Sequence, residues 1–455
     1  MKKYDILIIG AGPGGYVAAI KAAGLGMKVA LIEKEDIGGV CLNWGCIPTK
    51  ALLKSAHMLA SLKESDLYGF CIDTASIKID YSVAHKRSRQ ASSKLVKGVS
   101  YLIRKHGIDL INKEAKVIAP GKVVLGSGEE TIEGENIIIA AGARPAVIPG
   151  FIPDGKTVIT SRGALEMTKL PQKAVIIGAG AVGMEFADIW NSYGVDVTII
   201  EMMPRPLPNE DEEISAEIKK RFTAKGISIL ENKKVQRLDK NRVILSDGSV
   251  VDTDIVLLSA GIAADVKSVV DEKVSVEIQR GYIKIDEQMR TNIPGIYAIG
   301  DITGKLALAH AASAQGIQAV MHIAGRDTSD MVYENIPRCV YCSPQTASAG
   351  LTEKQAREKG YDVTTGRFPF SANGRAVSEN EPEGFIKIVA EKKYNEILGV
   401  HMVGENVTEL IGAAAAFISN EFTAEEVSRM IYPHPTRSEA IVEAALSLMG
   451  EPLHI

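Results

Sequence analysis

The order of apolar and polar positions predicts a strand, a glycine-rich turn, a helix and a second strand at the start of the chain. Residues 5–9 form a run that is apolar after Asp5, residues 10–15 hold four glycines, and residues 28–33 read as the next strand. A helical stretch between the two strands is typical of a parallel βαβ unit. Glu33 closes the second strand.

The same pattern returns near the middle of the chain. Residues 174–177 are apolar, residues 178–183 repeat the glycine spacing, and residues 196–201 read as a strand that ends in Glu201. In both copies the glutamate follows the first glycine by 23 residues. Because each copy has a strand before the glycines, a helix after them and a carboxylate on the second strand, the repeat predicts two dinucleotide-binding units.

The three spaced glycines of each copy have different physical roles. The first permits a sharp turn, the second lets the backbone approach a pyrophosphate, and the third lets the helix pack on the strand. The phosphates then meet the helix N-terminus, and the glutamate accepts a hydrogen bond from a ribose hydroxyl. The predicted binding residues are Gly10, Gly12, Gly15 and Glu33 in the first unit and Gly178, Gly180, Gly183 and Glu201 in the second.

The last third of the chain has a different pattern. Strand-like stretches at 385–389 and 396–400 are followed by helical runs at 407–418 and 438–449. This mixture predicts a separate α+β domain. Turn-rich segments, rather than low-complexity linkers, separate it from the two dinucleotide units.

Composition narrows the class of protein. Lys and Arg number 52 against 56 Asp and Glu, so the net charge of -4 provides no basic field for nucleic acid or for anionic lipid. No apolar run reaches the roughly 18 residues of a membrane span. Asp5 and the following glycines interrupt the first apolar run, which argues against a secretory signal. Five cysteines, an odd number, fit individual thiols in a reducing compartment, so we expect a cytoplasmic protein.

Two of these cysteines, Cys41 and Cys46, follow the first dinucleotide-binding unit, and Gly45 stands between them. Cys46 precedes a helical stretch that accepts Pro48 in its first turn, and a helix N-terminus favours a thiolate. On a regular helix, residues five apart have Cα atoms about 8 to 9 Å apart, beyond the roughly 7 Å limit for a disulfide. A bridge would need a distorted turn, which Gly45 permits. The alternative is two unrelated buried cysteines.

At this point the sequence resembles a known family. The residues CLNWGCIPTK at 41–50 resemble the redox-active disulfide of the pyridine nucleotide-disulfide oxidoreductases, and among them that of the dihydrolipoyl dehydrogenases. The resemblance covers essentially the whole chain. Residues 4–33 resemble the FAD unit, 291–301 the second FAD motif, 178–201 the NAD unit and 432–439 the C-terminal catalytic motif.

The resemblance implies an α/β fold class with two Rossmann-like domains, for FAD and NAD, and a C-terminal α+β dimerisation domain. The predicted domains are 1–145 for the first part of the FAD domain, 146–264 for the NAD domain, 265–334 for the second, central part of the FAD domain, and 335–455 for the interface domain. It also implies a homodimer.

Individual roles are implied in the same way. Cys41 would be the interchange sulfur that a substrate thiolate attacks, and Cys46 the thiolate that contacts the flavin. Lys50 would lie near flavin N5 and pair with Glu185. The other implied contacts are Ala115, Asp301 and Ala309 for FAD, and Val235 and Gly261 for NAD.

His434 and Glu439 are the predicted acid–base pair. A dithiol with a pKa near 8.5 is only about 3% thiolate at pH 7, so a base is useful. His434 would act as that base, and Glu439 would hold its imidazole in position. In the family the histidine comes from the second subunit, so a monomer would lack a complete site.

The resemblance implies NAD-dependent oxidation of dihydrolipoyl groups on a lipoyl-bearing protein of a 2-oxo acid dehydrogenase or glycine cleavage system. Glu201 is followed by Met202 and Met203 rather than by arginine, so it would accept a 2′-hydroxyl and repel a 2′-phosphate. This favours NAD, although Arg205 lies close by in sequence.

Two other functions stay open. The chain could be another flavin disulfide reductase that uses NAD(P)H on glutathione-like, CoA or mercuric substrates, or it could be a non-catalytic flavoprotein. Cys339 and Cys342 have a CxxC spacing, but they lie in a strand-like stretch without a partner pair, so we expect no metal centre. Cys71 is expected to be buried and inert.

Overall fold

The computed structural model describes residues 3–73, 76–128 and 130–455, and they form two compact units. The first unit comprises the chain up to residue 51 together with residues 82–146 and 261–333. The second comprises residues 52–81, 147–260 and 334–455. The segments predicted to bind FAD thus lie in the first unit except for residues 52–81 and residue 334, and the second unit holds most of the predicted NAD and interface domains.

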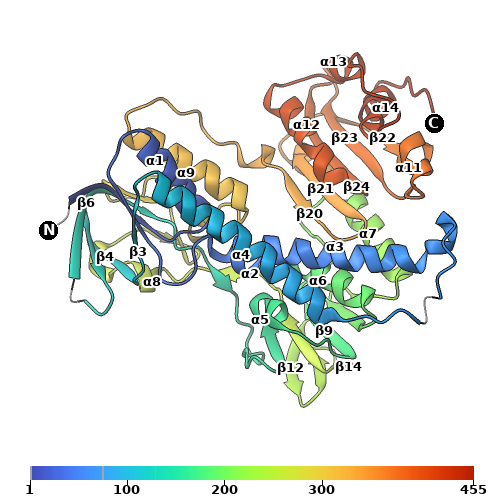
Figure 1. The fold of residues 1–455 in the computed structure, drawn as a ribbon. Coiled ribbons are helices and arrows are strands. Elements are labelled where there is room, and N and C mark those ends of the chain that lie inside the picture. Colours follow the sequence, from blue (N-terminus) through green and yellow to red (C-terminus); the bar gives the residue numbers. More distant parts are fainter. Residues whose placement is uncertain (1–2, 74–75, 129) are drawn as a thin grey trace. The chain divides into compact units, whose positions relative to one another are not determined.

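The first unit is built on a mixed sheet with the strand order β3-β2-β1-β6-β5-β4, in which β19 also pairs with β6. The parallel strands alternate with helices, as a dinucleotide-binding fold requires. Their bounds are β1 Lys3–Ile9, β2 Val29–Ile32, β3 Asp109–Ile111, β6 Glu130–Ile139 and β19 Ile296–Ala298, and the antiparallel strands are β4 Ala115–Ala119 and β5 Lys122–Leu125. Helices α1 (Pro13–Gly24) and α9 (Ala309–Ile323) pack against each other (Figure 1).

A short two-stranded sheet extends this unit. Strand β16 (Ile262–Ala263) pairs antiparallel with β7 (Arg144–Pro145), and the amide of Ala146 donates to the carbonyl of Gly261. These bonds attach residues 261–264 to the first unit. The domain boundary predicted at residue 264 had instead placed them in the NAD domain.

The second unit contains a fully parallel sheet with the order β11-β10-β9-β15-β8. Its strands are β8 Val158–Thr160, β9 Lys173–Ile177, β10 Asp196–Ile200, β11 Ser228–Leu230 and β15 Ile255–Leu258. Helices α5 (Ser161–Glu166), α6 (Ala181–Ser192) and α7 (Glu212–Ala224) connect them. A small antiparallel sheet comes next, made of β12 Val235–Asp239, β13 Arg242–Leu245 and β14 Val250–Asp252.

The predicted C-terminal α+β pattern is confirmed. A five-stranded antiparallel sheet has the order β20-β21-β24-β23-β22, and helices pack against it. The strands are β20 Arg338–Val340, β21 Gln345–Gly350, β22 Val363–Pro369, β23 Phe385–Glu391 and β24 Ile397–Gly404. The helices are α10 Glu353–Glu358, α11 Gly374–Ser378, α12 Val407–Ser419, α13 Ala424–Ser428 and α14 Glu439–Leu448.

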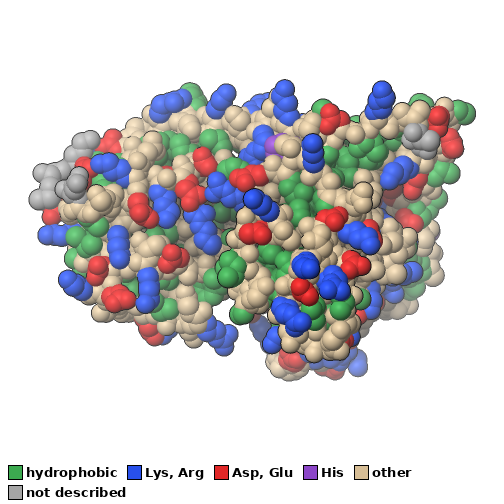
Figure 2. All heavy atoms as spheres, turned by 90° about the horizontal axis from the view of Figure 1, so that it is seen from below, with side chains coloured by type: hydrophobic (Ala, Val, Ile, Leu, Met, Phe, Trp, Pro, Cys, Tyr) green, Lys and Arg blue, Asp and Glu red, His purple; other side chains and the backbone are tan. Residues whose placement is uncertain are grey.

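Three further helices, α2 (Gly39–Trp44), α3 (Cys46–Lys63) and α4 (Tyr81–Lys105), hold the cysteine motif and its surroundings. No helix among the described residues is long and apolar enough to cross a membrane. Acidic and basic side chains are interspersed over the face drawn in Figure 2.

Cys71, Cys339 and Cys342 are not disulfide-bonded. Cys339 lies on β20 and Cys342 lies just beyond that strand, buried, with its thiol 3.4 Å from the carbonyl oxygen of Pro344. Burial raises the pKa of the Cys342 thiol well above its usual value. The expectation for Cys71 was wrong, because this residue is exposed in the connection between α3 and α4.

Candidate active site

The first glycine turn has the geometry of a nucleotide cradle. Gly10 has a φ of +106°, and a Cβ there would lie 2.3 Å from the carbonyl oxygen of Ala140. A Cβ on Gly15 would lie 1.8 Å from the carbonyl oxygen of Gly10, so helix α1 could not pack so closely with any other residue. A Cβ on Gly12 would meet nothing within 4 Å. The open space beside Gly12, at the start of α1, fits a pyrophosphate.

Glu33 links the end of β2 to this turn. One carboxylate oxygen accepts the Ala11 amide at 2.7 Å and the other accepts the Glu35 amide, also at 2.7 Å. Each oxygen keeps a lone pair for a ribose hydroxyl. The other predicted FAD residues also lie in the first unit, with Ala115 buried at the start of β4, Ala309 at the first position of α9, and Asp301 in a short 3₁₀ helix.

The carboxyl of Asp301 is perturbed by its surroundings. Burial raises the pKa of its carboxyl above the ordinary value. Asp301 is half-buried, and a carboxyl removed from water in this way needs hydrogen-bond donors; the hydroxyls of a ribityl chain are suitable donors. The neighbouring Gly300 amide is held by the side-chain oxygen of Gln315, a buried residue of α9, at 2.6 Å.

The second glycine turn repeats the first in detail. Gly178 has a φ of +105°, and a Cβ on Gly183 would lie 2.1 Å from the carbonyl oxygen of Gly178. A Cβ on Gly180 would meet nothing within 4 Å. Glu201, at the end of β10, accepts the Ala179 amide at 2.6 Å and the Met203 amide at 2.8 Å. Both turns therefore fit a dinucleotide.

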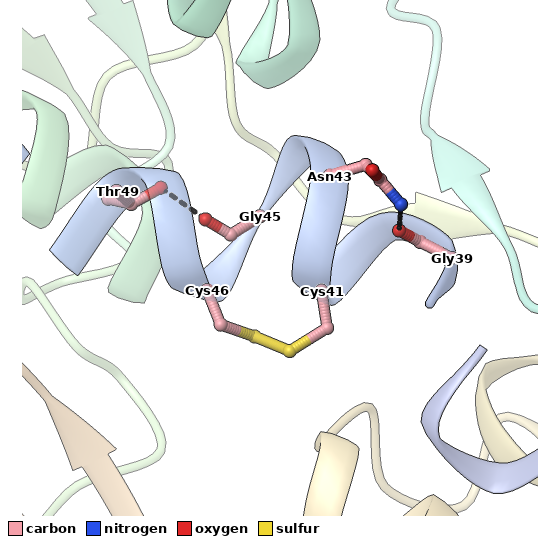
Figure 3. The surroundings of a disulfide bond; sticks show 6 residues. All are labelled: Gly39, Cys41, Asn43, Gly45, Cys46 and Thr49. Carbon is pink, nitrogen blue, oxygen red and sulfur yellow. Dashed lines mark hydrogen bonds between the residues drawn. A yellow bond between two sulfur atoms is a disulfide. The ribbon is translucent and has the colours of Figure 1, made fainter. Parts of the chain in front are cut away.

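The cysteines form a disulfide in an interrupted helix. Helix α2 ends at Trp44, Gly45 adopts φ -146° and ψ -112°, and α3 begins at Cys46. Figure 3 shows Cys41 and Cys46 joined by their sulfurs across this break. The Cα atoms of the two cysteines are 4.7 Å apart, well below the spacing on a regular helix. The distorted turn expected at Gly45 is confirmed.

Local hydrogen bonds fix both sides of the break (Figure 3). The side-chain amide of Asn43 donates through Nδ2 to the carbonyl oxygens of Ile37 and Gly39, both at 3.0 Å. On the other side, the Thr49 hydroxyl donates to the Gly45 carbonyl oxygen at 2.6 Å. The redox-active geometry is therefore built into the backbone around the disulfide.

Lys50 lies four residues after Cys46 on α3, in the first unit, and Glu185 lies on α6 in the second. Glu185 is buried and accepts the Tyr341 amide at 3.1 Å. Their pairing stays a prediction. Val235 begins β12 in the second unit, and Gly261, with a φ of +103°, belongs to the first.

His434 and Glu439 form a hydrogen-bonded pair at the start of α14. Imidazole Nδ1 is 2.8 Å from one oxygen of Glu439, and the Thr436 amide donates to the other oxygen at 2.7 Å. Burial raises the pKa of Glu439, but the bonds from Thr436 and His434 outweigh it, and the pKa lies below its usual value. A charged Glu439 favours the proton on Nδ1, so Nε2 can act as a base.

The His434 side chain is 78% exposed, and Ile431, three positions earlier in the chain, is 99% exposed. A base on an open surface cannot exclude water from a reacting thiol by itself.

Sequence reasoning missed Arg89, a residue of α4 whose guanidinium binds the backbone of the cysteine segment. It stands more than forty positions from Cys46 and belongs to no motif. The only available signal was a basic residue on an otherwise amphipathic helix, which does not indicate a partner.

Comparison with known proteins identifies the family. Residues 4–316 match the family model of the pyridine nucleotide-disulphide oxidoreductases, and residues 336–445 match the dimerisation domain of the same family. The chain is 42% identical over 479 residues to the dihydrolipoyl dehydrogenase of Rhizobium etli, which covers 100% of this chain and 99% of that protein. It is 41% identical over 472 residues to the dihydrolipoyl dehydrogenase of Bacillus subtilis, with 99% of each covered.

Solved structures agree with this grouping. LpdA from Mycobacterium tuberculosis superposes with a TM-score of 0.90 at 27% identity, covering 98% of this chain and 99% of that one. The HOCl-induced flavoprotein disulfide reductase RclA from Escherichia coli, solved as a Cu(II) complex, gives 0.86 at 28% identity, covering 98% and 99%. The predicted fold class and family resemblance are thereby confirmed, and the chain belongs to the pyridine nucleotide-disulphide oxidoreductases and, within them, to the dihydrolipoyl dehydrogenases.

Proposed function

We propose that the chain oxidises protein-bound dihydrolipoyl groups to the lipoyl disulfide and reduces NAD⁺ to NADH, through the Cys41–Cys46 disulfide. The observation that carries this proposal is the disulfide in an interrupted helix, in the same unit as the glycine turn and the half-buried Asp301 that fit FAD. FAD, when bound, would supply two-electron redox chemistry between the reduced cysteines and NAD⁺.

The chain's own residues carry out the thiol chemistry. A substrate thiolate attacks the sulfur of Cys41, the bond to Cys46 breaks, and Cys46 leaves as a thiolate at the N-terminus of α3, where the helix dipole stabilises negative charge. Nε2 of His434 takes the proton of the second substrate thiol, which then attacks the mixed disulfide and releases Cys41. One substrate dithiol thus becomes a disulfide while the enzyme disulfide becomes a dithiol.

His434 is proposed to act on the disulfide of a second chain in a homodimer. Support comes from the match to a dimerisation domain over residues 336–445 and from the exposure of the His434 side chain in one chain. Lys50 and Glu185 would pair beside the flavin, and Val235 and Gly261 would contact NAD. The lipoyl group would be carried by a protein of a 2-oxo acid dehydrogenase or glycine cleavage system.

The test is NADH production from free dihydrolipoamide by the FAD-loaded protein, with NADP⁺ and His434→Gln as controls. We expect fast turnover with NAD⁺, and a loss of about 10² to 10⁴-fold in the variant because a general base is removed. If a flavin-loaded dimer showed no turnover, the substrate would have to be a disulfide other than the lipoyl group. The chain would then be another flavin disulfide reductase, a class that includes a solved structure of similar fold.

A further inference from the structure

Arg89 of α4 binds the short segment that separates the two cysteines. Its Nη2 atom donates to the carbonyl oxygen of Asn43 at 2.6 Å. Its guanidinium carbon lies 4.6 Å from the centroid of the Trp44 ring. Asn43 and Trp44 are the residues just before the Gly45 break, and all of these groups belong to the first unit.

The bond to Asn43 replaces one that the break removes. In an unbroken helix, the carbonyl of residue 43 would accept the amide of residue 47, and the cysteine Cα atoms would be about 8 to 9 Å apart. Because α2 stops at Trp44, the last carbonyls of α2 need other donors. Arg89 supplies one, with a cation that does not deprotonate in proteins.

Stacking on Trp44 orients the guanidinium over the same turn. A cation above an indole ring is attracted by the ring's quadrupole, and Trp is the strongest aromatic partner. Arg89 is half-buried, so these contacts are less weakened by water than they would be on an open surface. Two contacts from one side chain therefore hold the interrupted conformation.

Arg87, two residues earlier on α4, offers an internal comparison. Its Nη1 atom donates to the carbonyl oxygen of Ala51 at 3.0 Å, on α3 beyond the disulfide. Both arginines lie on α4 and each donates to a backbone carbonyl. The carbonyl that Arg89 binds lies between the two cysteines, and the one that Arg87 binds lies after them.

We propose that Arg89 is a positioning residue for the redox-active pair, which holds the broken turn in both redox states and so favours the disulfide over the dithiol. Without it, the reduced segment can relax toward a continuous helix that moves the two sulfurs apart. The inference rests on the proposed function only in requiring that Cys41 and Cys46 cycle between disulfide and dithiol.

The experiment measures the disulfide–dithiol equilibrium of the FAD-loaded protein in buffers of reduced and oxidised dithiothreitol. Thiols are trapped by alkylation and counted by mass spectrometry at Cys41 and Cys46. Arg89→Met should raise the equilibrium constant for reduction about tenfold, which corresponds to about 30 mV for this two-electron couple. Arg89→Lys, which keeps the charge and a donor, should remain within about threefold of the wild type, and Arg87→Met should not change it.

An unchanged constant in Arg89→Met, or an equal shift in Arg87→Met, would overturn the proposal. If Arg89→Met does not retain FAD, Trp44→Leu tests the same idea, because it removes the stacking and leaves the carbonyl bond; the expected shift is smaller and in the same direction, and no shift would count against the role. The equilibrium is independent of substrate identity. Failure of dihydrolipoamide turnover alone would therefore refute the proposed function and leave this inference intact.

Discussion

The two dinucleotide units differ little in their glycine turns and much in the residues that come after the glutamate. In both turns the third glycine packs against the carbonyl of the first, and the second glycine faces open space. In the first unit the chain returns at once to this turn, since a Cβ on Gly39 would lie 2.7 Å from the Cα of Gly12. In the second, Met202 and Met203 follow the glutamate and are exposed.

This difference connects each turn to a different role. Gly39 begins the helix that carries Cys41, so the first turn and the redox segment are packed against each other. A cofactor bound there would be part of the folded redox centre. In the second unit the chain also returns to its turn, since the Leu207 amide donates to the Ala179 carbonyl oxygen at 2.9 Å. That segment leads into α7 and carries no cysteine, which suits a nucleotide that binds and leaves during each catalytic cycle.

Gly15→Val should break the first unit most severely. A Cβ at this position would lie 1.8 Å from the carbonyl oxygen of Gly10, so the turn must move away from α1. We expect purified protein with almost no FAD, measured by flavin absorbance, and no detectable turnover. Gly24→Val on the same helix is the control, because a Cβ there meets nothing within 4 Å. Full FAD content in Gly15→Val would contradict the role of this turn.

Glu201→Ala tests the choice of nucleotide in the second unit. Two like charges about 4 Å apart repel by about 4 kcal/mol at an effective dielectric of 20. The wild type should therefore prefer NAD⁺ over NADP⁺ by roughly a thousandfold, and the variant should lose most of this preference. The ratio of kcat/KM for the two nucleotides is the measurement. A ratio equal to that of the wild type would refute the assignment of Glu201.

The sequence was sufficient for features that depend on local chemistry. The glycine turns, the glutamates and the break at Gly45 each follow from residues within one short segment, and the structure bears out the turn at Gly45. The contacts of Arg89 with Asn43 and of His57 with Asp188 join residues 46 and 131 positions apart. Such contacts depend on the tertiary fold, and no local pattern encodes them. Cys71 was misjudged for a related reason, since a thiol's burial depends on what packs over it.

Asp188→Asn should destabilise the second unit. Asp188, on α6, is 1% exposed and accepts bonds from Lys225 at 2.8 Å, from the Ser343 amide at 2.8 Å and from His57 at 2.9 Å. Burial raises the pKa of Asp188, but the bond from His57 and the charge of Lys225 outweigh it, so the pKa lies below the usual value. Removing one partner of a buried pair costs about 3 kcal/mol of unfolding free energy.

The sign of the pH dependence follows from this lowered pKa. The charged carboxylate stabilises the folded state fully above its unfolded pKa of about 4, and that contribution is lost as the pH falls through the folded pKa. The difference between the variant and the wild type should therefore be full at pH 7 and shrink below about pH 4. The measurement is the unfolding free energy in urea, followed by the fluorescence of buried Trp190. A Trp44→Phe background removes the other tryptophan of the chain. Asp196→Asn, at an exposed position, should change neither the unfolding free energy nor its dependence on pH.

Gly183→Ala should give the smallest of these effects and separates the two units most cleanly. The added Cβ would lie 2.1 Å from the carbonyl oxygen of Gly178, so the glycine turn must shift. We expect this shift to weaken nucleotide binding by about 2 kcal/mol. The KM for NAD⁺ should then rise about 30-fold, while FAD content and the anaerobic reduction of the flavin by dihydrolipoamide remain as in the wild type. Since the first turn is untouched, a loss of FAD in this variant would mean that the two turns are not independent, and the contrast between a resident and an exchanging nucleotide would have to be abandoned.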